Sequence, residues 1–356
     1  MKKYTFFAVA LATIAFVGCN KDNKFVPDEN GMVSIMLSGE KYVSQDKQAF
    51  SGARDQIYFT NEDSMYVNGG ACAITCIANG LGTSTTESNL GSVAIPAELI
   101  YNPLYAFYPT SAFTPGTAAD YSDWTVTMKN NVVLITPDAE IGIQTPMSAI
   151  HQTWPLTAYV PDVTTNDNVQ LKNNVALMTP AVKYGFNFVD ELTRTRLSDE
   201  TFDGTNFPTL VVEKVVLSSS NTILTGTGHI ANLNSSEPYL VMDGTMPTAD
   251  NPDVMTLFVG NPDVNPGMEV APTGNYTTNL GHAAIAPITD SANHNIHIAL
   301  HFRLTYPGTN NTYNCVYEGD GVFNNTNVVR SERSTLACDL FSVTGVSKIT
   351  SIQRAE

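Results

Sequence analysis

Short apolar segments separated by Asn, Gly and Pro recur along the chain and predict β-strands. In the first half they lie at 57–59, 64–67, 73–77, 92–95, 104–108, 124–128, 132–135 and 156–160. Asn68-Gly69-Gly70 and Asn79-Gly80 are hairpin signals, because Asn and Gly tolerate positive φ. No helical pattern of ten or more residues competes with these strands. Short strands at a spacing of about ten residues predict an all-β sandwich or barrel.

A second series of strands is predicted beyond a polar stretch at 162–168, which is the best candidate for a linker. These strands lie at 175–178, 182–188, 211–217, 223–224, 240–242, 255–259, 295–306, 313–317 and 336–343. Two strand-rich blocks of similar size predict two β-sandwich domains in tandem, over residues 31–165 and 166–356.

The segment from Asn295 to Tyr306 alternates most regularly between apolar and polar residues. One face carries Ile296, Ile298, Leu300, Phe302 and Leu304. The opposite face carries His297, His301, Arg303 and Thr305. This period of two indicates a strand with one buried face.

The N-terminus has the pattern of a bacterial lipoprotein signal. Lys2 and Lys3 precede an uncharged apolar run at 4–17, which is too short for a membrane span. The run ends in Phe16-Val17-Gly18-Cys19, which resembles a lipobox. We therefore expect residues 1–18 to be removed, Cys19 to carry the lipid, and residues 19–30 to form a tether outside the cytoplasm.

The first predicted strand of the mature chain is Met32 to Ser38, apolar at five of its seven positions. It is expected to be largely buried on both faces. Residues 39–52 have no periodic pattern and are interpreted as an exposed loop leading to Arg54.

Composition excludes some partners. The net charge of −16 over 356 residues argues against nucleic acid and against an anionic bilayer as the binding surface. Thr, Ser and Asn fill many polar positions, as is usual for exposed strand faces and turns.

No catalytic or metal site is predicted. His294, His297 and His301 would share a face on a helix, but the alternating Ile and Leu residues indicate a strand, so no metal is expected. Glu318-Gly319-Asp320-Gly321 is interpreted as a turn rather than a calcium site. No nucleophile is seen beside an activating base, so we expect neither an enzyme nor a cofactor.

Four cysteines remain once Cys19 is lipidated: Cys72, Cys76, Cys315 and Cys338. On one strand, Cys72 and Cys76 would lie about 13 Å apart, which is too far for a disulfide. Buried thiols are favoured, although an even number of cysteines in an exported protein also permits disulfides.

Several segments along the chain form an ordered set: the lipobox, the first strand, Asp55 to Gly69, Tyr105-Ala106-Phe107-Tyr108-Pro109-Thr110-Ser111, Gln144-Thr145-Pro146-Met147, Ala181 to Phe186 and Val212 to Leu217. Together these segments resemble the fimbrillin superfamily of Bacteroidetes pilus subunits. Phe59 replaces the usual Trp of the family and Glu62 the usual Gly. The resemblance covers most of the first 230 residues.

The resemblance implies two transthyretin-like, Greek-key β-sandwich domains and a lipoprotein of the outer membrane that joins other fimbrial subunits. It also implies that a trypsin-like protease cuts the loop after the first strand, for which Arg54 is the best candidate and Lys41 and Lys47 are weaker ones. A strand from another subunit would then fill the exposed slot. The alternative is a glycan-binding surface lipoprotein that uses Trp124, Trp154 and Tyr121 as stacking platforms.

Overall fold

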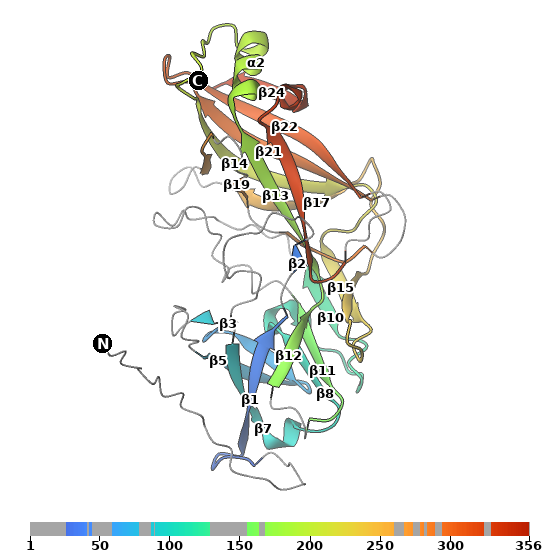
Figure 1. Ribbon diagram of the computed structural model, residues 1–356. Coiled ribbons are helices and arrows are strands. Elements are labelled where there is room, and N and C mark those ends of the chain that lie inside the picture. Colours follow the sequence, from blue (N-terminus) through green and yellow to red (C-terminus); the bar gives the residue numbers. More distant parts are fainter. Residues whose placement is uncertain are drawn as a thin grey trace, which may run out of the picture.

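The computed structural model describes residues 26–40, 43–44, 59–77, 87–88, 90–128, 155–163, 168–259, 267–272, 278–280, 283–288, 294–323 and 329–355. Within these residues the protein is built mainly from β-sheets. Figure 1 shows two lobes along one axis, with the N-terminal strands in one lobe and most strands of the second half in the other. No helix in the described ranges combines the length and apolarity needed to cross a bilayer.

The first lobe is a closed barrel. Its strands follow the order β1 (Met32–Gly39), β12 (Asn168–Asn173), β11 (Leu156–Val160), β8 (Leu104–Tyr108), β4 (Ser64–Val67), β5 (Gly70–Cys76) and β7 (Leu90–Pro96). Two further pieces, β3 (Phe59–Thr60) and β6 (Glu87–Ser88), pair with each other. The all-β prediction is confirmed at this level, but tandem transthyretin-like sandwiches are not, because this lobe closes around one core.

The β4–β5 hairpin forms at the predicted Asn-Gly turn. Asn68 and Gly69 have φ angles of 44° and 87°, which these residue types accept at low cost. The Asn68 side chain donates to the carbonyl of Leu99 at 2.8 Å and accepts from the N–H of Tyr105 at 2.8 Å. This turn is thereby tied to the neighbouring strand β8 and to the short 3₁₀ helix η1 (Ala97–Leu99).

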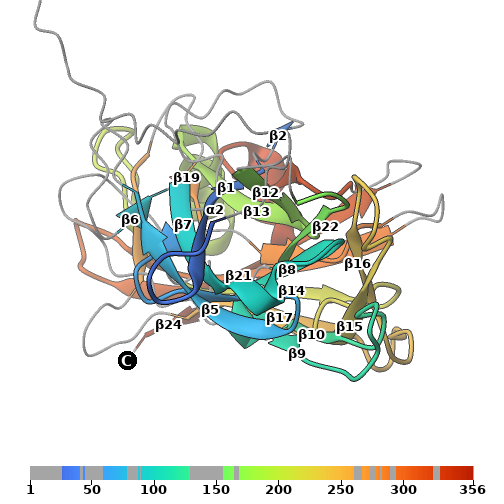
Figure 2. The ribbon, with the colours of Figure 1, turned by 90° about the horizontal axis from the view of Figure 1, so that it is seen from below.

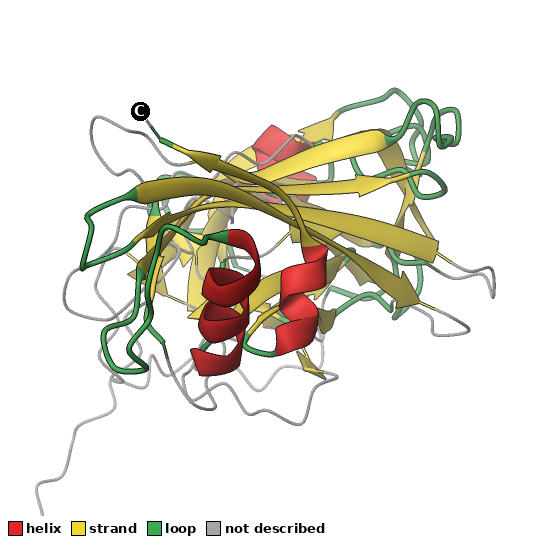
Figure 3. Cartoon of the chain, turned by 90° about the horizontal axis from the view of Figure 1, so that it is seen from above, coloured by secondary structure: helices red, strands yellow, loops and turns green. Residues whose placement is uncertain are grey.

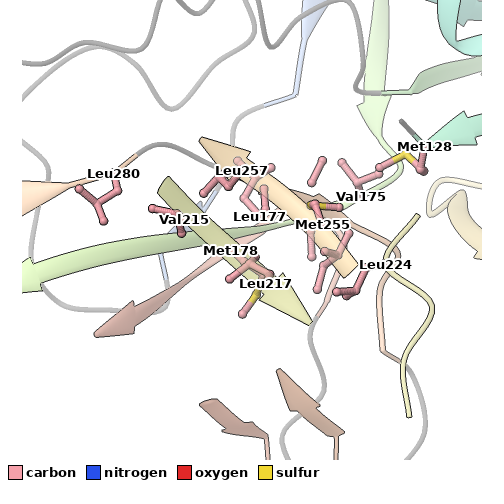
Figure 4. Close-up of a cluster of buried hydrophobic side chains, with 14 of the residues drawn as sticks. Met128, Val175, Leu177, Met178, Val215, Leu217, Leu224, Met255, Leu257 and Leu280 are labelled. Carbon is pink, nitrogen blue, oxygen red and sulfur yellow. The ribbon is translucent and has the colours of Figure 1, made fainter. Parts of the chain in front are cut away.

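The second lobe packs two sheets face to face. One has the order β19 (Thr278–Asn279), β13 (Ala176–Tyr184), β23 (Glu332–Leu340) and β2 (Val43–Ser44), with β20 (Ala283–Ile285) also paired to β13. The other has the order β17 (Asp253–Val259), β14 (Thr209–Ser219), β21 (His294–Thr305), β22 (Thr312–Phe323) and β24 (Ile349–Arg354), with β18 (Met268–Val270) on β14. Figure 4 shows aliphatic residues from β13, β14 and β17 meeting between them.

A third sheet joins the two halves of the chain. It runs β16 (Tyr239–Met242), β15 (Gly226–Ala231), β10 (Thr125–Met128) and β9 (Phe113–Thr114), the last of which follows the 3₁₀ helix η2 (Thr110–Ala112). These strands are grouped on one side of the molecule (Figure 2). Because β10 pairs with β15, strands of residues 31–165 and 166–356 share a sheet. Strand β12, which begins at Asn168, likewise completes the first lobe.

Helix α2 (Phe186–Arg196) corrects the interpretation of residues 182–188 as a strand. The alternation of Tyr184, Phe186 and Phe188 suggested a period of two, but β13 ends at Tyr184 and the helix buries Phe188, Val189 and Leu192. These three residues lie on one helical face. Helix α2 packs beside the 3₁₀ helix η3 (Val343–Lys348) at the far end of the second lobe (Figure 3).

The strand predicted at 295–306 is confirmed as β21. Its five alternating apolar residues, from Ile296 to Leu304, are all buried, and the polar residues between them are partly exposed. The turn predicted at Glu318 to Gly321 is wrong, because those residues continue strand β22. The ladder with β21 runs along the whole of β22 and pairs these residues on that edge, and this outweighs the turn preference of the two glycines.

Candidate functional site

Strand β1 is the candidate functional element of the first lobe. Val33, Ile35 and Leu37 point into the barrel and are at most 4% exposed. The alternate residues Ser34 and Met36 face outward, and Met36 is 39% exposed. The expectation that both faces are buried is therefore wrong, because the closed barrel has a single interior. The strand alternates between a buried aliphatic face and an outer face.

Both edges of β1 are hydrogen-bonded to other strands. It runs antiparallel to β7, from Met32 opposite Pro96 to Ser38 opposite Leu90. Its second half runs parallel to β12, from Met36 opposite Asn168 to Gly39 opposite Leu171. Removing β1 would leave two strands with unpaired backbone groups and an open hydrophobic core. We call the space between β7 and β12 the β1 groove.

Buried residues of β7 and β12 line the β1 groove. Ile35 lies opposite Val93 of β7, and Leu37 lies opposite Gly91 of β7 and Val169 of β12. Val93 and Val169 are almost fully buried. Gly91 is small for a packing reason, since a Cβ there would stand 3.0 Å from the side chain of Ile74 and 3.2 Å from that of Phe59.

A tight turn starts β1. The carboxylate of Asp28 accepts from the N–H groups of Asn30 at 2.8 Å and of Met32 at 2.9 Å. Gly31 within this turn has a φ of 75°, which glycine adopts at low cost. The carbonyl of Gly31 accepts from the N–H of Ala97, just beyond β7. The beginning of β1 is therefore held by local contacts and by the neighbouring strand.

Charged contacts hold the other end of β1. The carboxylate of Glu40 accepts from Nη1 of Arg330 at 2.7 Å and from the N–H of Asn173 at 3.1 Å, and it lies 3.4 Å from Nζ of Lys172. We call Glu40, Lys172, Asn173 and Arg330 the Glu40 cluster. Sequence reasoning missed it, because its members are up to 290 positions apart and none belongs to a motif.

The chain passes from the Glu40 cluster into the second lobe. Strand β2 lies parallel to β23, with Val43 opposite Glu332 and Ser44 opposite Arg333. Part of the segment 39–52, which was interpreted as a loop, is thus a short strand. The interpretation failed because two residues without alternation give no local signal. Strand β1 therefore pairs within the first lobe and strand β2 within the second.

The two predicted site residues, Cys19 and Arg54, lie outside the described residues, as does the whole signal segment 1–18. Trp154 also lies outside them. Lipid attachment and proteolytic processing therefore remain predictions from the sequence.

The other two aromatic residues considered for glycan stacking are buried. Trp124 is 5% exposed, and its ring stacks on Phe107 with a centroid distance of 4.5 Å. Tyr121 is 9% exposed and packs against Trp124 at 5.3 Å. Neither ring presents the open face that a sugar needs, so their geometry is that of a packed aromatic cluster.

The histidines of β21 make contacts within the sheet. Nδ1 of His297 shares a hydrogen bond of 2.7 Å with Asp320 on the neighbouring strand. Burial and the nearby Lys214 lower the pKa of His301 below its ordinary value. Among the described residues, no group of three or more His, Cys, Asp or Glu side chains is placed to hold a metal ion.

The four described cysteines are free thiols, and the burial favoured from the sequence is found for three of them. Cys72, Cys315 and Cys338 are buried, and Cys76 is partly exposed. Burial raises the pKa of Cys72, and it raises the pKa values of Cys315 and Cys338 to about 12. Because the thiolate is the reactive form, these three thiols are protected from reagents both by their burial and by staying protonated.

A thiol-labelling experiment tests this arrangement. We expect a thiol reagent at pH 8 to modify Cys76 first in the folded protein, with Cys315 and Cys338 reacting only after denaturation. Mass spectrometry of the labelled peptides gives the order. Peptides of Cys315 and Cys338 that stay unlabelled in denaturant without a reductant would contradict the assignment of free thiols.

Comparison with solved structures finds matches of low sequence identity and low TM-score to bacterial proteins. A candidate cell adhesion protein from Bacteroides ovatus is 12% identical, with a TM-score of 0.40 over 94% of this chain and 97% of that one. A second, from Bacteroides uniformis, is 13% identical, with a TM-score of 0.37 over 92% and 98%. A fimbrial assembly protein from Parabacteroides distasonis is 9% identical, with a TM-score of 0.31 over 91% and 99%. No protein-family model and no curated protein matches the chain.

Proposed function

We propose that this protein is a structural or accessory subunit of a cell-surface fimbria, exported as a lipoprotein and assembled by exchange of its first strand. The observation that carries the proposal is the position of β1. The first described strand of the chain is paired on both edges and places three aliphatic side chains in the barrel core. A strand in this position can be replaced by another strand that has aliphatic residues at the same alternate positions.

Hydrolysis after Arg54 would be the step that makes exchange possible. One water molecule is consumed, the peptide bond between Arg54 and Asp55 breaks, and a carboxylate and an amine are formed. The N-terminal fragment then contains β1, Glu40 and β2. Its departure would break contacts with both lobes, so cutting makes release possible without forcing it.

Lipidation at Cys19 would place the protein on the outer membrane before assembly. Two or more acyl chains give an anchor that a single chain does not. We expect Cys19→Ser to abolish membrane attachment, so that the protein moves from the membrane fraction to the soluble fraction. Labelled palmitate that still enters the Cys19→Ser protein would contradict this assignment.

The experiment that tests strand exchange is limited cleavage of the purified chain by a trypsin-like protease, followed by a measurement of its mass in solution. Cleaved protein is expected to polymerise or to bind an added peptide copying residues 31–38. The same protein with Arg54→Ala is expected to stay monomeric.

A further inference from the structure

The Glu40 cluster lies where β1 ends and the second lobe begins. Arg330 belongs to the segment leading into β23 of the second lobe, whereas Lys172 and Asn173 end β12 of the barrel. Their common acceptor, the carboxylate of Glu40, belongs to neither of these segments. It directly follows β1, where the N–H of Glu40 donates to the carbonyl of Leu171. Glu40 thus arrives with the strand and contacts residues that remain when the strand leaves.

The receiving side is held in place without Glu40. Nη1 of Arg330 also donates to the carbonyl of Asn173 at 3.3 Å, and Nη2 donates to the carbonyl of Ser236 at 3.3 Å. The amide of Asn173 donates to Oγ of Ser331 at 2.8 Å. These contacts fix the guanidinium and the β12 terminus relative to each other. A prearranged group of donors binds an incoming anion at a lower cost in entropy.

Partial burial strengthens the interaction between the Glu40 carboxylate and the Arg330 guanidinium. The side chains of Arg330 and Glu40 are 12% and 19% exposed, so their contact is partly shielded from water. A strand that placed a neutral residue here would leave two cations facing a site without an anion. A basic residue would add repulsion.

We propose that Arg330, together with Lys172 and the N–H of Asn173, recognises a carboxylate on the strand that enters the β1 groove. The partner is an extended segment of another subunit with aliphatic residues at alternate positions, followed by Asp or Glu at the position of Glu40. This inference rests on the proposed strand exchange and names the chemistry that selects the strand. The aliphatic residues provide affinity, and the carboxylate provides register and specificity.

Two peptides test this selection. Both copy residues 31–40 and carry a C-terminal amide, so that a terminal carboxylate cannot replace the side chain, but one has Gln in place of Glu40. On the protease-cleaved full chain we expect the Glu peptide to bind at least about tenfold more tightly, as for a charged hydrogen-bonded contact. With Arg330→Gln the preference for the Glu peptide should fall severalfold, to what Lys172 and the N–H of Asn173 still provide.

Arg303→Gln is the matched control. Arg303 forms an ion pair of 3.4 Å with Glu213 within the second-lobe sheet, away from the Glu40 cluster. This variant should keep the preference for the Glu peptide. If Arg303→Gln also lost the preference for the Glu peptide, the preference would come from the overall charge of the protein, and the inference would be overturned.

The remaining outcomes separate this inference from strand exchange itself. Equal binding of the two peptides to the unmodified cleaved chain would overturn the carboxylate selection and leave strand exchange standing. Binding of neither peptide by cleaved protein that has lost its N-terminal fragment and stays monomeric would refute the exchange and the selection with it.

A cycle on the uncleaved chain then tests the contact alone. The double variant Glu40→Gln, Arg330→Gln is expected to lower the urea midpoint of unfolding by less than the sum of the two single shifts, because both single variants break the same contact. Additive shifts would show that the two side chains do not interact.

Discussion

Cleavage after Arg54 is expected to convert the monomeric chain into a form that is unstable by itself and is rescued by any strand that fits the β1 groove. Val33, Ile35 and Leu37 are almost fully buried. Burying each such side chain contributes about 1.5–3 kcal/mol, so losing all three removes about 5–9 kcal/mol. That is comparable with the whole stability of a domain.

Melting temperature and mass distribution check this result before and after cleavage. Loss of the fragment should lower the melting temperature, and addition of a peptide copying residues 31–38 should restore it. Arg54→Ala, treated with the same protease, should keep the original melting temperature and mass. Cleaved protein that has lost the fragment yet stays monomeric with an unchanged melting temperature would show that β1 is a dispensable edge.

Substitutions on the two faces of β1 should differ by several kcal/mol in their effect on the free energy of unfolding. Ile35→Ala removes buried methylene and methyl groups from the barrel core and is expected to lower the free energy of unfolding by about 2–5 kcal/mol. Met36→Ala, one position along, truncates a side chain that is 39% exposed. Its effect should be much smaller, because less apolar surface is withdrawn from water.

Urea denaturation of the uncleaved full chain measures both free energies. The same two substitutions in the peptide copying residues 31–38 should reproduce the ranking as binding affinities. Equal effects of Ile35→Ala and Met36→Ala would contradict the assignment of Ile35 to the interior face. If Ile35→Ala has the larger effect on unfolding of the chain but not on binding of the peptide, the peptide does not occupy the β1 groove.

Local patterns predicted the strands that have one buried face. The alternation from Ile296 to Leu304 matches β21, and the apolar residues from Met32 to Leu37 match β1. The Asn68-Gly69 turn was also recognisable, because few residue types accept its φ angles. Each of these features depends on side chains that are close in sequence.

Features decided by distant contacts could not be predicted. Strand β2 exists because it lies beside β23, and Glu40 meets Arg330 only through the fold. Helix α2 was missed for a different reason, since Tyr184, Phe186 and Phe188 fit a period of two until β13 ends. Closure of the first lobe into a barrel likewise depends on pairing between β1 and β12, far apart in the chain.

The most direct test of the account is the N-terminus of the protein as it occurs on the cell surface. Mass spectrometry of the N-terminal peptide from assembled material distinguishes the possible starts. Strand exchange predicts a chain that begins at Asp55, without β1, β2 or the lipid. An assembled chain that begins at acylated Cys19 and retains β1 would contradict it.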